Sequence, residues 1–186
     1  MNSVTVIFSN MEDSESLVFK DIWNGLPNVK VVEVNRHNGS ARKKVDTAIL
    51  AEKDTLILCG HGFPSGLISP QPRGDGLLVS ERNVRFIKAK RVIGIWCHAS
   101  AFAQNEGLHG FFSSMFISNK KQAIMNNCTK SDSAVIASEK ALFCQRVRNL
   151  IASDIPMQEW KQVLIEQADM TIDVTRFNYN RLTYLP

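Results

Sequence analysis

Short apolar runs alternate with amphipathic segments along most of this chain. The apolar runs have the length and the β-branched content that are typical of buried strands. The strands predicted in this way are Val4–Phe8, Val29–Val34, Thr55–Cys59, Arg91–Trp96 and Gln122–Asn126. Apolar residues at helical spacing predict helices over residues 14–24, 40–53, 104–117, 132–151 and 156–168.

Two stretches depart from this alternation. The segment after the third strand is rich in proline and glycine, and within it Gly66–Ser69 and Gly76–Val79 are predicted to pair as a small hairpin. Ser80 suits the N-cap of a short helix that ends near Lys88. The tail, residues 171–186, is rich in β-branched and aromatic residues and predicts a last strand.

Repeated strand–helix–strand units predict an α/β fold with a mostly parallel central sheet of about six strands and helices on both faces. No internal repeat, low-complexity tract or linker interrupts the pattern, so residues 1–186 are expected to form a single domain. In sheets of this kind, functional sites form at the carboxyl ends of the strands.

Composition narrows the class of protein. With 44% hydrophobic and 22% charged residues, the chain has the composition of an ordinary globular protein. The net charge of +4 is not gathered into a long basic run, so we expect no nucleic-acid partner. No apolar stretch approaches the roughly 20 residues that cross a bilayer, and no secretory signal opens the sequence, so no membrane association is expected. Four cysteines without a CxxC motif favour a reducing, cytoplasmic location.

His61 and Cys97 directly follow the third and fourth predicted strands. Neighbouring parallel strands lie about 4.8 Å apart, so side chains at their tips can approach each other across a cleft. A cysteine nucleophile needs an exposed, rigidly held thiol near a base or a positive charge. Gly62 leaves the backbone after His61 uncluttered, so that its N–H can face a developing oxyanion. These residues predict a Cys–His site.

The two blocks that carry the site read Thr55-Leu-Ile-Leu-Cys-Gly-His61-Gly62 and Arg91-Val-Ile-Gly-Ile-Trp-Cys97-His-Ala-Ser100. They resemble clan CD cysteine peptidases, the caspase-like family that includes gingipains, clostripain, separase and the bacterial CHAT domains. In that family one apolar strand ends in His-Gly and a later apolar strand ends in Cys. The resemblance covers roughly the whole chain, although only the two blocks are motif-like. It implies a caspase-like three-layer sandwich.

The resemblance also implies roles for these residues. Cys97 resembles the nucleophile that attacks a peptide carbonyl, and His61 resembles the general acid that protonates the leaving amine. In this family the two side chains often lie too far apart for a tight ion pair. The backbone N–H groups of Gly62 and Cys97 resemble the oxyanion hole. No third catalytic residue, metal or organic cofactor is expected; the expected partner is a peptide or protein substrate, and a regulatory protein partner is left open.

Two residues depart from the family pattern. Trp96 stands where many members have a small residue before the nucleophile, and His98 follows the cysteine where a polar or small residue is commoner. Both are expected to reshape the pocket. A catalytically inactive caspase-like module that binds a partner protein is therefore the alternative function.

Substrate preference is not predicted from the sequence. The loop that follows His61 is expected to form one wall of the cleft. Within that loop, Arg73 and Asp75 are candidates for contact with a charged substrate, and an ordinary solvated loop is the equal alternative.

Other candidate sites are weaker. The side-chain types of a zinc site occur at the two strand ends, but zinc ligands favour short loops or helical spacing over two central strands, so no metal is expected. The residues considered as zinc ligands are Cys59, His61, Cys97 and His98. A nucleotide-binding α/β domain is disfavoured because the chain has no GxGxxG or GxxxxGK(S/T) motif, and Glu12 and Asp13 after the first strand repel phosphate. Residues assigned to packing, turns or helix surfaces are Cys128, Cys144, His37, His109 and Trp160.

Overall fold

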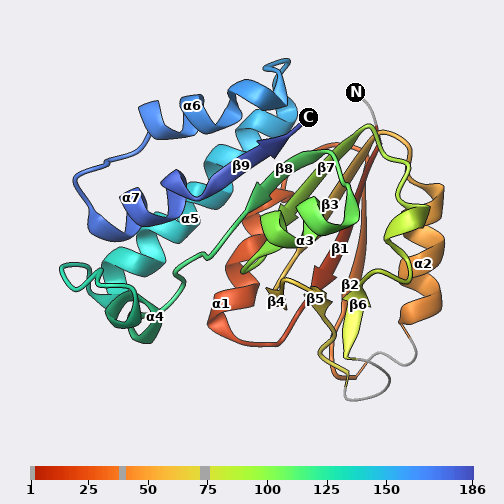
Figure 1. Cartoon of the computed structure of the whole chain (residues 1–186), viewed down its shortest axis with the longest axis horizontal. Helices are drawn as coiled ribbons and strands as arrows, with labels where there is room; N and C mark the ends of the chain where they lie inside the picture. Colours follow the sequence, from red (N-terminus) through yellow and green to blue (C-terminus); the bar gives the residue numbers. More distant parts are fainter. Residues whose placement is uncertain (1–2, 38–40, 72–75) are drawn as a thin grey trace.

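The computed structural model describes residues 3–37, 41–71 and 76–186. Its main element is a six-stranded sheet with the strand order β2-β1-β3-β7-β8-β9 (Figure 1). The strands are β1 (Val4–Ser9), β2 (Val29–Val34), β3 (Thr55–Cys59), β7 (Arg91–Ile95), β8 (Gly110–Ser113) and β9 (Leu182–Leu185). Neighbouring strands are parallel except β8 and β9, which are antiparallel. The mostly parallel α/β sheet that the alternating pattern predicts is confirmed.

Helices pack on both faces of this sheet (Figure 1). The helices that the structure describes are α1 (Ser14–Leu17), η1 (Val18–Ile22), α2 (Arg42–Ala51), η2 (Val84–Phe86), α3 (Ala99–Glu106), α4 (Lys120–Met125), α5 (Ser133–Ala152), η3 (Met157–Glu159), α6 (Trp160–Glu166) and α7 (Asp173–Asn180), where η denotes a 3-10 helix. Of these, α4 packs in a separate cluster and not on the sheet. Successive strand residues point to opposite faces. Phe8 and Ile57 therefore pack with η1, α5 and α6, whereas Ile7 and Leu58 pack with α2 and α3.

The segment after Cys97 differs from the prediction. A helix was expected over residues 104–117, but α3 begins at Ala99 and ends at Glu106, and Gly107 caps it in a left-handed conformation with φ of +65°. The next apolar residues then form β8, the fifth strand in sheet order. The helical prediction was wrong because it read the apolar residues of β8 as one face of a helix.

The predicted strand Gln122–Asn126 was also wrong. This segment forms α4, which is capped at its start by the Asn119 side chain, an acceptor for the Gln122 N–H at 2.9 Å. Only Ala123 is buried in it, and Ile124 and Met125 are exposed, so the apolar residues do not enter the sheet.

A small antiparallel sheet lies beside the main one. It consists of β4 (Gly62–Phe63), β5 (Gly66–Ile68) and β6 (Leu77–Val79), so the hairpin that the sequence predicts is confirmed and gains one strand. The short helix expected after Ser80 is only the 3-10 turn η2. The predicted last strand is confirmed as β9, and α7 precedes it within the same tail.

Candidate active site

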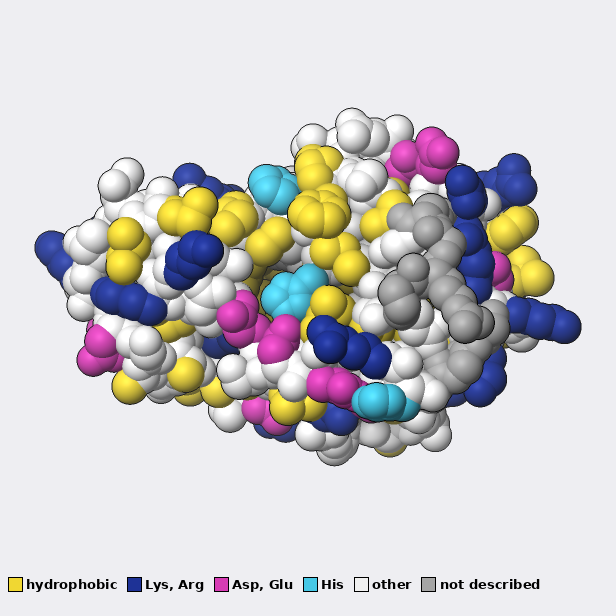
Figure 2. Space-filling model, turned by 90° about the horizontal axis from the view of Figure 1, so that it is seen from below, with side chains coloured by type: hydrophobic (Ala, Val, Ile, Leu, Met, Phe, Trp, Pro, Cys, Tyr) yellow, Lys and Arg dark blue, Asp and Glu magenta, His cyan; other side chains and the backbone are white. Residues whose placement is uncertain are grey.

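The residues of the candidate site follow three neighbouring strands. In the sheet β3 lies between β1 and β7, and all three run in the same direction. Asp13 follows β1, His61 follows β3 and Cys97 follows β7, so all three residues lie at the carboxyl edge of the sheet. Figure 2 views the molecule from this side and shows histidine side chains near its centre, next to acidic side chains. The predicted neighbourhood of the His61 and Cys97 strands is present in the structure.

Gly60 lets the chain turn from β3 to His61. Its φ is +145°, and a Cβ placed there would lie 2.6 Å from the Cβ of Ser9 at the end of β1. A side chain at this position would push β1 and β3 apart. The glycine before His61 therefore has a packing role that the sequence motif does not reveal.

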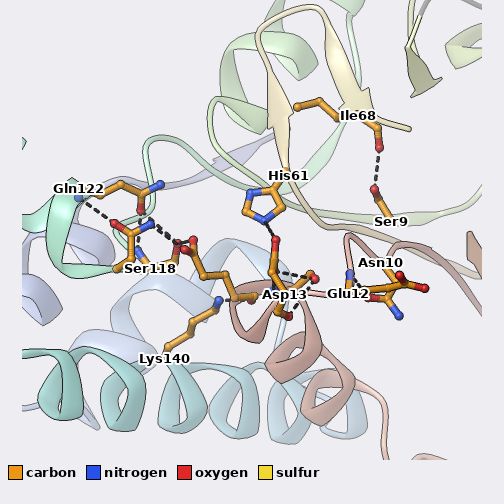
Figure 3. A network of polar contacts seen from close by, with 12 residues as sticks. Ser9, Asn10, Glu12, Asp13, His61, Ile68, Ser118, Gln122 and Lys140 are labelled. Atoms are coloured by element: carbon orange, nitrogen blue, oxygen red, sulfur yellow. Dashed lines mark hydrogen bonds and ion pairs between the residues drawn. The ribbon is translucent and has the colours of Figure 1, made fainter. Parts of the chain in front are cut away.

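His61 is held by an aspartate. Its Nε2 lies 3.1 Å from Oδ2 of Asp13, and Figure 3 shows the imidazole above this carboxylate. Asp13 also caps α1, where its Oδ1 accepts hydrogen bonds from the backbone N–H of Ser16 at 2.6 Å and from the Ser16 hydroxyl at 2.8 Å. The imidazole is 29% exposed, so it is anchored at one nitrogen and still reaches solvent.

The pKa of Asp13 reflects these contacts. Burial raises this pKa, but the hydrogen bonds from Ser16 and the interaction with His61 outweigh burial, and the net pKa lies below its usual value. Asp13 is therefore a carboxylate at neutral pH and accepts a hydrogen bond from Nε2–H of His61. That arrangement leaves Nδ1 as the nitrogen that can exchange a proton with a ligand.

Cys97 occupies a tight turn between β7 and α3. His98 after it adopts a left-handed conformation with φ of +72°, and the N–H of Ala99 donates to the carbonyl of Trp96 at 3.2 Å. The thiol of Cys97 donates to the carbonyl of Phe116 at 3.6 Å. Burial and the nearby Glu15 raise the pKa of Cys97 and outweigh the hydrogen bond with Phe116 and the charge of Lys140, which lower it.

The side chains of His61 and Cys97 lie on the same side of the sheet. His61 contacts the residue that caps α1, and Cys97 contacts Phe116, which packs in the core formed with η1 and α5. Among the residues that the structure describes, no hydrogen bond joins the two side chains: Nε2 bonds to Asp13 and the thiol bonds to Phe116.

Trp96 packs between α3 and the residues that follow His61. It is 1% exposed and packs on the opposite face, where its ring centre lies 5.7 Å from that of Phe102. Its Nε1–H donates to the carbonyl of Phe63 at 3.2 Å. Strand alternation turns this indole toward α3 while the next residue faces the site, and the expected effect of Trp96 on the pocket stays a prediction.

Gly62 has two features that bear on its predicted role. A Cβ there would lie 1.9 Å from Cδ1 of Trp96, so the indole requires a glycine. The N–H of Ile68 donates to the carbonyl of His61, which places His61 in the hydrogen-bonded register with β5 and directs the N–H of Gly62 away from that strand. Within the described ranges no acceptor takes a hydrogen bond from the N–H of Cys97. The oxyanion-hole role of these two N–H groups stays a prediction.

A polar network that the sequence did not predict borders the site. The carboxylate of Glu15 accepts hydrogen bonds from the Ser118 hydroxyl and, at 2.8 Å, from the Asn119 amide. Ser118 also donates its N–H to the side chain of Gln122 at 2.8 Å (Figure 3). Lys140 on α5 is 4% exposed and donates to the carbonyl of Glu15. None of these residues was singled out in the sequence, where only the neighbouring Glu12 and Asp13 were noted, as residues that repel phosphate.

The weaker candidate sites do not assemble. Among residues 3–37, 41–71 and 76–186, no group of three or more His, Cys, Asp or Glu side chains is arranged to hold a metal ion. Cys59 is fully buried in the sheet core, and Cys128 and Cys144 are buried as well. Trp160 is a core residue, as predicted, whereas His109 lies beyond α3 and contacts the carbonyl of Pro186. Arg73 and Asp75 lie outside the described residues.

No described helix is both long enough and apolar enough to cross a membrane. Comparisons with known proteins give no relative: no protein-family model, no curated protein and no solved structure matches the chain.

Proposed function

We propose that this chain is a cysteine peptidase of the caspase-like type, with Cys97 as the nucleophile and His61 as the general acid. The observation that carries the proposal is the pairing of β3 with β7, which brings an imidazole and a partly exposed thiol to one edge of the sheet. The hydrogen bond between Asp13 and His61 supports it further, because histidines that transfer protons are commonly oriented by a carboxylate.

In the proposed reaction, the thiolate of Cys97 attacks the carbonyl carbon of a peptide bond, and the carbonyl π bond becomes an oxyanion. The N–H groups of Gly62 and Cys97 face this oxyanion. His61 donates a proton from Nδ1 to the leaving nitrogen as the C–N bond breaks, and a thioester remains. Water then attacks the thioester, transfers its proton to His61 and releases the carboxylic acid product and Cys97.

A caspase-like module that binds a partner protein without cleaving it is the second candidate. The raised pKa of Cys97, which burial causes, favours this alternative because it holds the sulfur in the neutral form. The two proposals differ in whether the thiol reacts.

Peptide cleavage by purified protein separates them. The wild type and the variants Cys97→Ala and His61→Ala are incubated with a diverse peptide library, and products are identified by mass spectrometry. The proposal expects cleavage by the wild type and none by Cys97→Ala. His61→Ala is expected to be slower by about 100-fold or more, the usual contribution of a general acid.

Cys128→Ala is the matched control, because Cys128 is buried and lies outside the site. It should cleave like the wild type. If the wild type cleaves no peptide in the library and a thiol-directed peptidyl probe labels Cys97 no faster than Cys128, the peptidase proposal is wrong and the binding module takes its place.

A further inference from the structure

A buried lysine lies beneath the candidate site and has no place in the proposed reaction. Lys140 is on α5, is 4% exposed, and its Nζ lies 4.7 Å from the centre of the Phe19 ring while it donates to the carbonyl of Glu15. Figure 3 shows it pointing from α5 toward the segment of Asp13, with His61 on the other side of that segment. A lysine is rarely buried unless nearby groups compensate its charge.

The loop that accepts the Cys97 thiol is anchored on the same helix. The ring of Phe116 packs at 4.8 Å from the ring of Phe143, which is one turn of α5 beyond Lys140. The same loop continues into Ser118, which donates to the carboxylate of Glu15. One packed wall therefore lies behind the thiol of Cys97. It consists of the loop that contains Phe116 and Ser118 (here the Phe116 loop), the start of α1, and Lys140.

Titratable groups from several elements meet in this wall. They are Asp13 and Glu15 at α1, His61 after β3, Cys97 after β7, and Lys140 and Cys144 on α5. Burial lowers the pKa of Lys140, while the nearby Cys144, Glu15, Asp13 and Cys97 each raise it. Burial raises the pKa of Cys97, the hydrogen bond with Phe116 lowers it, Glu15 raises it and Lys140 lowers it, and the net pKa lies above its usual value. Lys140 and Glu15 therefore act on the thiol in opposite directions.

His61 is hydrogen-bonded to Asp13 and not to Cys97. Its Nε2 is bound to Asp13, and no hydrogen bond links it to Cys97 within the described part of the chain. A cation next to a thiol favours the thiolate, which is the reactive form. Lys140 supplies such a cation from the protein interior, where charge interactions are screened less than at the surface.

We propose that Lys140 is a cation that supports the Cys97 thiolate, so that Lys140 increases the reactivity of Cys97 and Glu15 decreases it. The inference rests on the proposed function only for the role of Cys97 as nucleophile. Lys140 acts through Cys97 and is not itself a catalytic residue. In this arrangement His61 does not deprotonate the thiol and acts only as the proton donor to the leaving amine.

The test measures alkylation of Cys97 by iodoacetamide as a function of pH, with peptide mapping by mass spectrometry to separate the four cysteines. Lys140→Met keeps the length of the side chain and removes the charge, and it should slow alkylation of Cys97 at pH 7.5 by about three- to tenfold and move the pH profile to higher pH. Lys140→Arg keeps the charge and should restore most of the rate. Glu15→Gln should accelerate alkylation.

Two measurements separate an electrostatic role from a structural one. Cys144 is fully buried, so its alkylation reports opening of the fold and should stay slow in every variant. Lys43→Met on the far side of the sheet is the matched control for loss of a lysine charge and should leave Cys97 unchanged. The inference is overturned if Lys140→Met alkylates at Cys97 with the wild-type rate and pH profile.

Failure of the peptidase proposal would look different. Alkylation needs no substrate, so a wild type that cleaves no peptide can still show the dependence on Lys140 and Glu15. In that case the peptidase proposal is wrong, and the proposed effect of Lys140 and Glu15 on the reactivity of Cys97 is supported.

Discussion

Nε2 of His61 lies 3.1 Å from Oδ2 of Asp13, although the two residues are 48 positions apart in the chain. The contact follows from the sheet: β1 and β3 are neighbours and run in parallel, so the loop that leaves β1 meets the residue that follows β3. Asp13 performs a second task as the N-cap of α1, and this fixes its carboxylate before any ligand binds. The orientation of the imidazole is thereby built into the fold.

Asp13→Asn tests the orienting role without loss of the helix cap. Asparagine is as good an N-cap as aspartate, so α1 should be retained and the unfolding temperature should change little. The amide has no negative charge for the histidine, and we expect a fall in peptide cleavage of about 10- to 100-fold. Cleavage rates measured from pH 5 to pH 9 check this, because the profile should change in shape as well as height.

Glu12→Gln is the control for this change. It removes an acidic charge from the adjacent position, whose carboxylate lies near His37 instead of His61. Its cleavage rate should stay close to that of the wild type. If Asp13→Asn cleaves peptide at the same rate as Glu12→Gln, Asp13 does not orient His61 for the reaction.

The sequence predicted the sheet better than the site. Buried parallel strands leave uninterrupted β-branched runs, so the bounds of β1, β2 and β3 are nearly as predicted. Beyond β7 the pattern became ambiguous, because the apolar run of β8 can also be read as the face of a helix. Tertiary pairing with β7 and β9 decides its structure, and this pairing is absent from local sequence.

His61 and Cys97 were found because each follows a recognisable strand, whereas their surroundings were not. Asp13 gave only a local acidic signal together with Glu12, Glu15 was not singled out, and Lys140 lies in a helix whose sequence offers no reason to separate it from surface lysines. What distinguishes these residues is burial and the meeting of segments far apart in the chain. Neither property can be read from one sequence.

Gly62→Ala should destabilise the fold through Trp96. The added methyl would lie 1.9 Å from the indole Cδ1, and such overpacking typically costs about 1–3 kcal/mol. Urea unfolding of Gly62→Ala, Trp96→Ala and the double variant measures the coupling. The cost of Gly62→Ala should be much smaller in the Trp96→Ala background; additive costs would mean that the glycine is needed for another reason.

Asn178→Ala should loosen the loop that accepts the Cys97 thiol. The buried Asn178 side chain accepts from the N–H of Ile117 at 2.7 Å and donates to its carbonyl at 3.0 Å. Loss of both bonds leaves buried backbone groups unpaired and should cost about 1–3 kcal/mol in the free energy of unfolding. Urea unfolding gives this value, and alkylation of Cys97 in the folded variant should change as the Phe116 loop shifts. Thr183→Ala on β9, next to β8, is the control and should leave the alkylation rate unchanged.

Glu52 should make stability depend on pH. It is 4% exposed at the end of α2, and its carboxylate accepts hydrogen bonds from the hydroxyls of Thr5 at 2.6 Å and Ser3 at 2.7 Å. The N–H groups of Lys53 and Asp54 also donate to it, at 2.9 and 2.8 Å. Burial raises the pKa of Glu52, but these bonds outweigh burial and lower it below its usual value.

A lowered carboxyl pKa stabilises the folded state above the ordinary pKa of the unfolded chain, about 4.3, and this stabilisation is lost as the pH falls through the folded value. The wild type should therefore exceed Glu52→Gln in the free energy of unfolding at pH 7, by about 1–3 kcal/mol, since charged acceptors bind more strongly than neutral ones. Urea unfolding at pH 7, 5 and 3 should show this difference shrinking at the lowest pH. A difference that stays constant across the series would mean that Glu52 acts through packing and not through its charge.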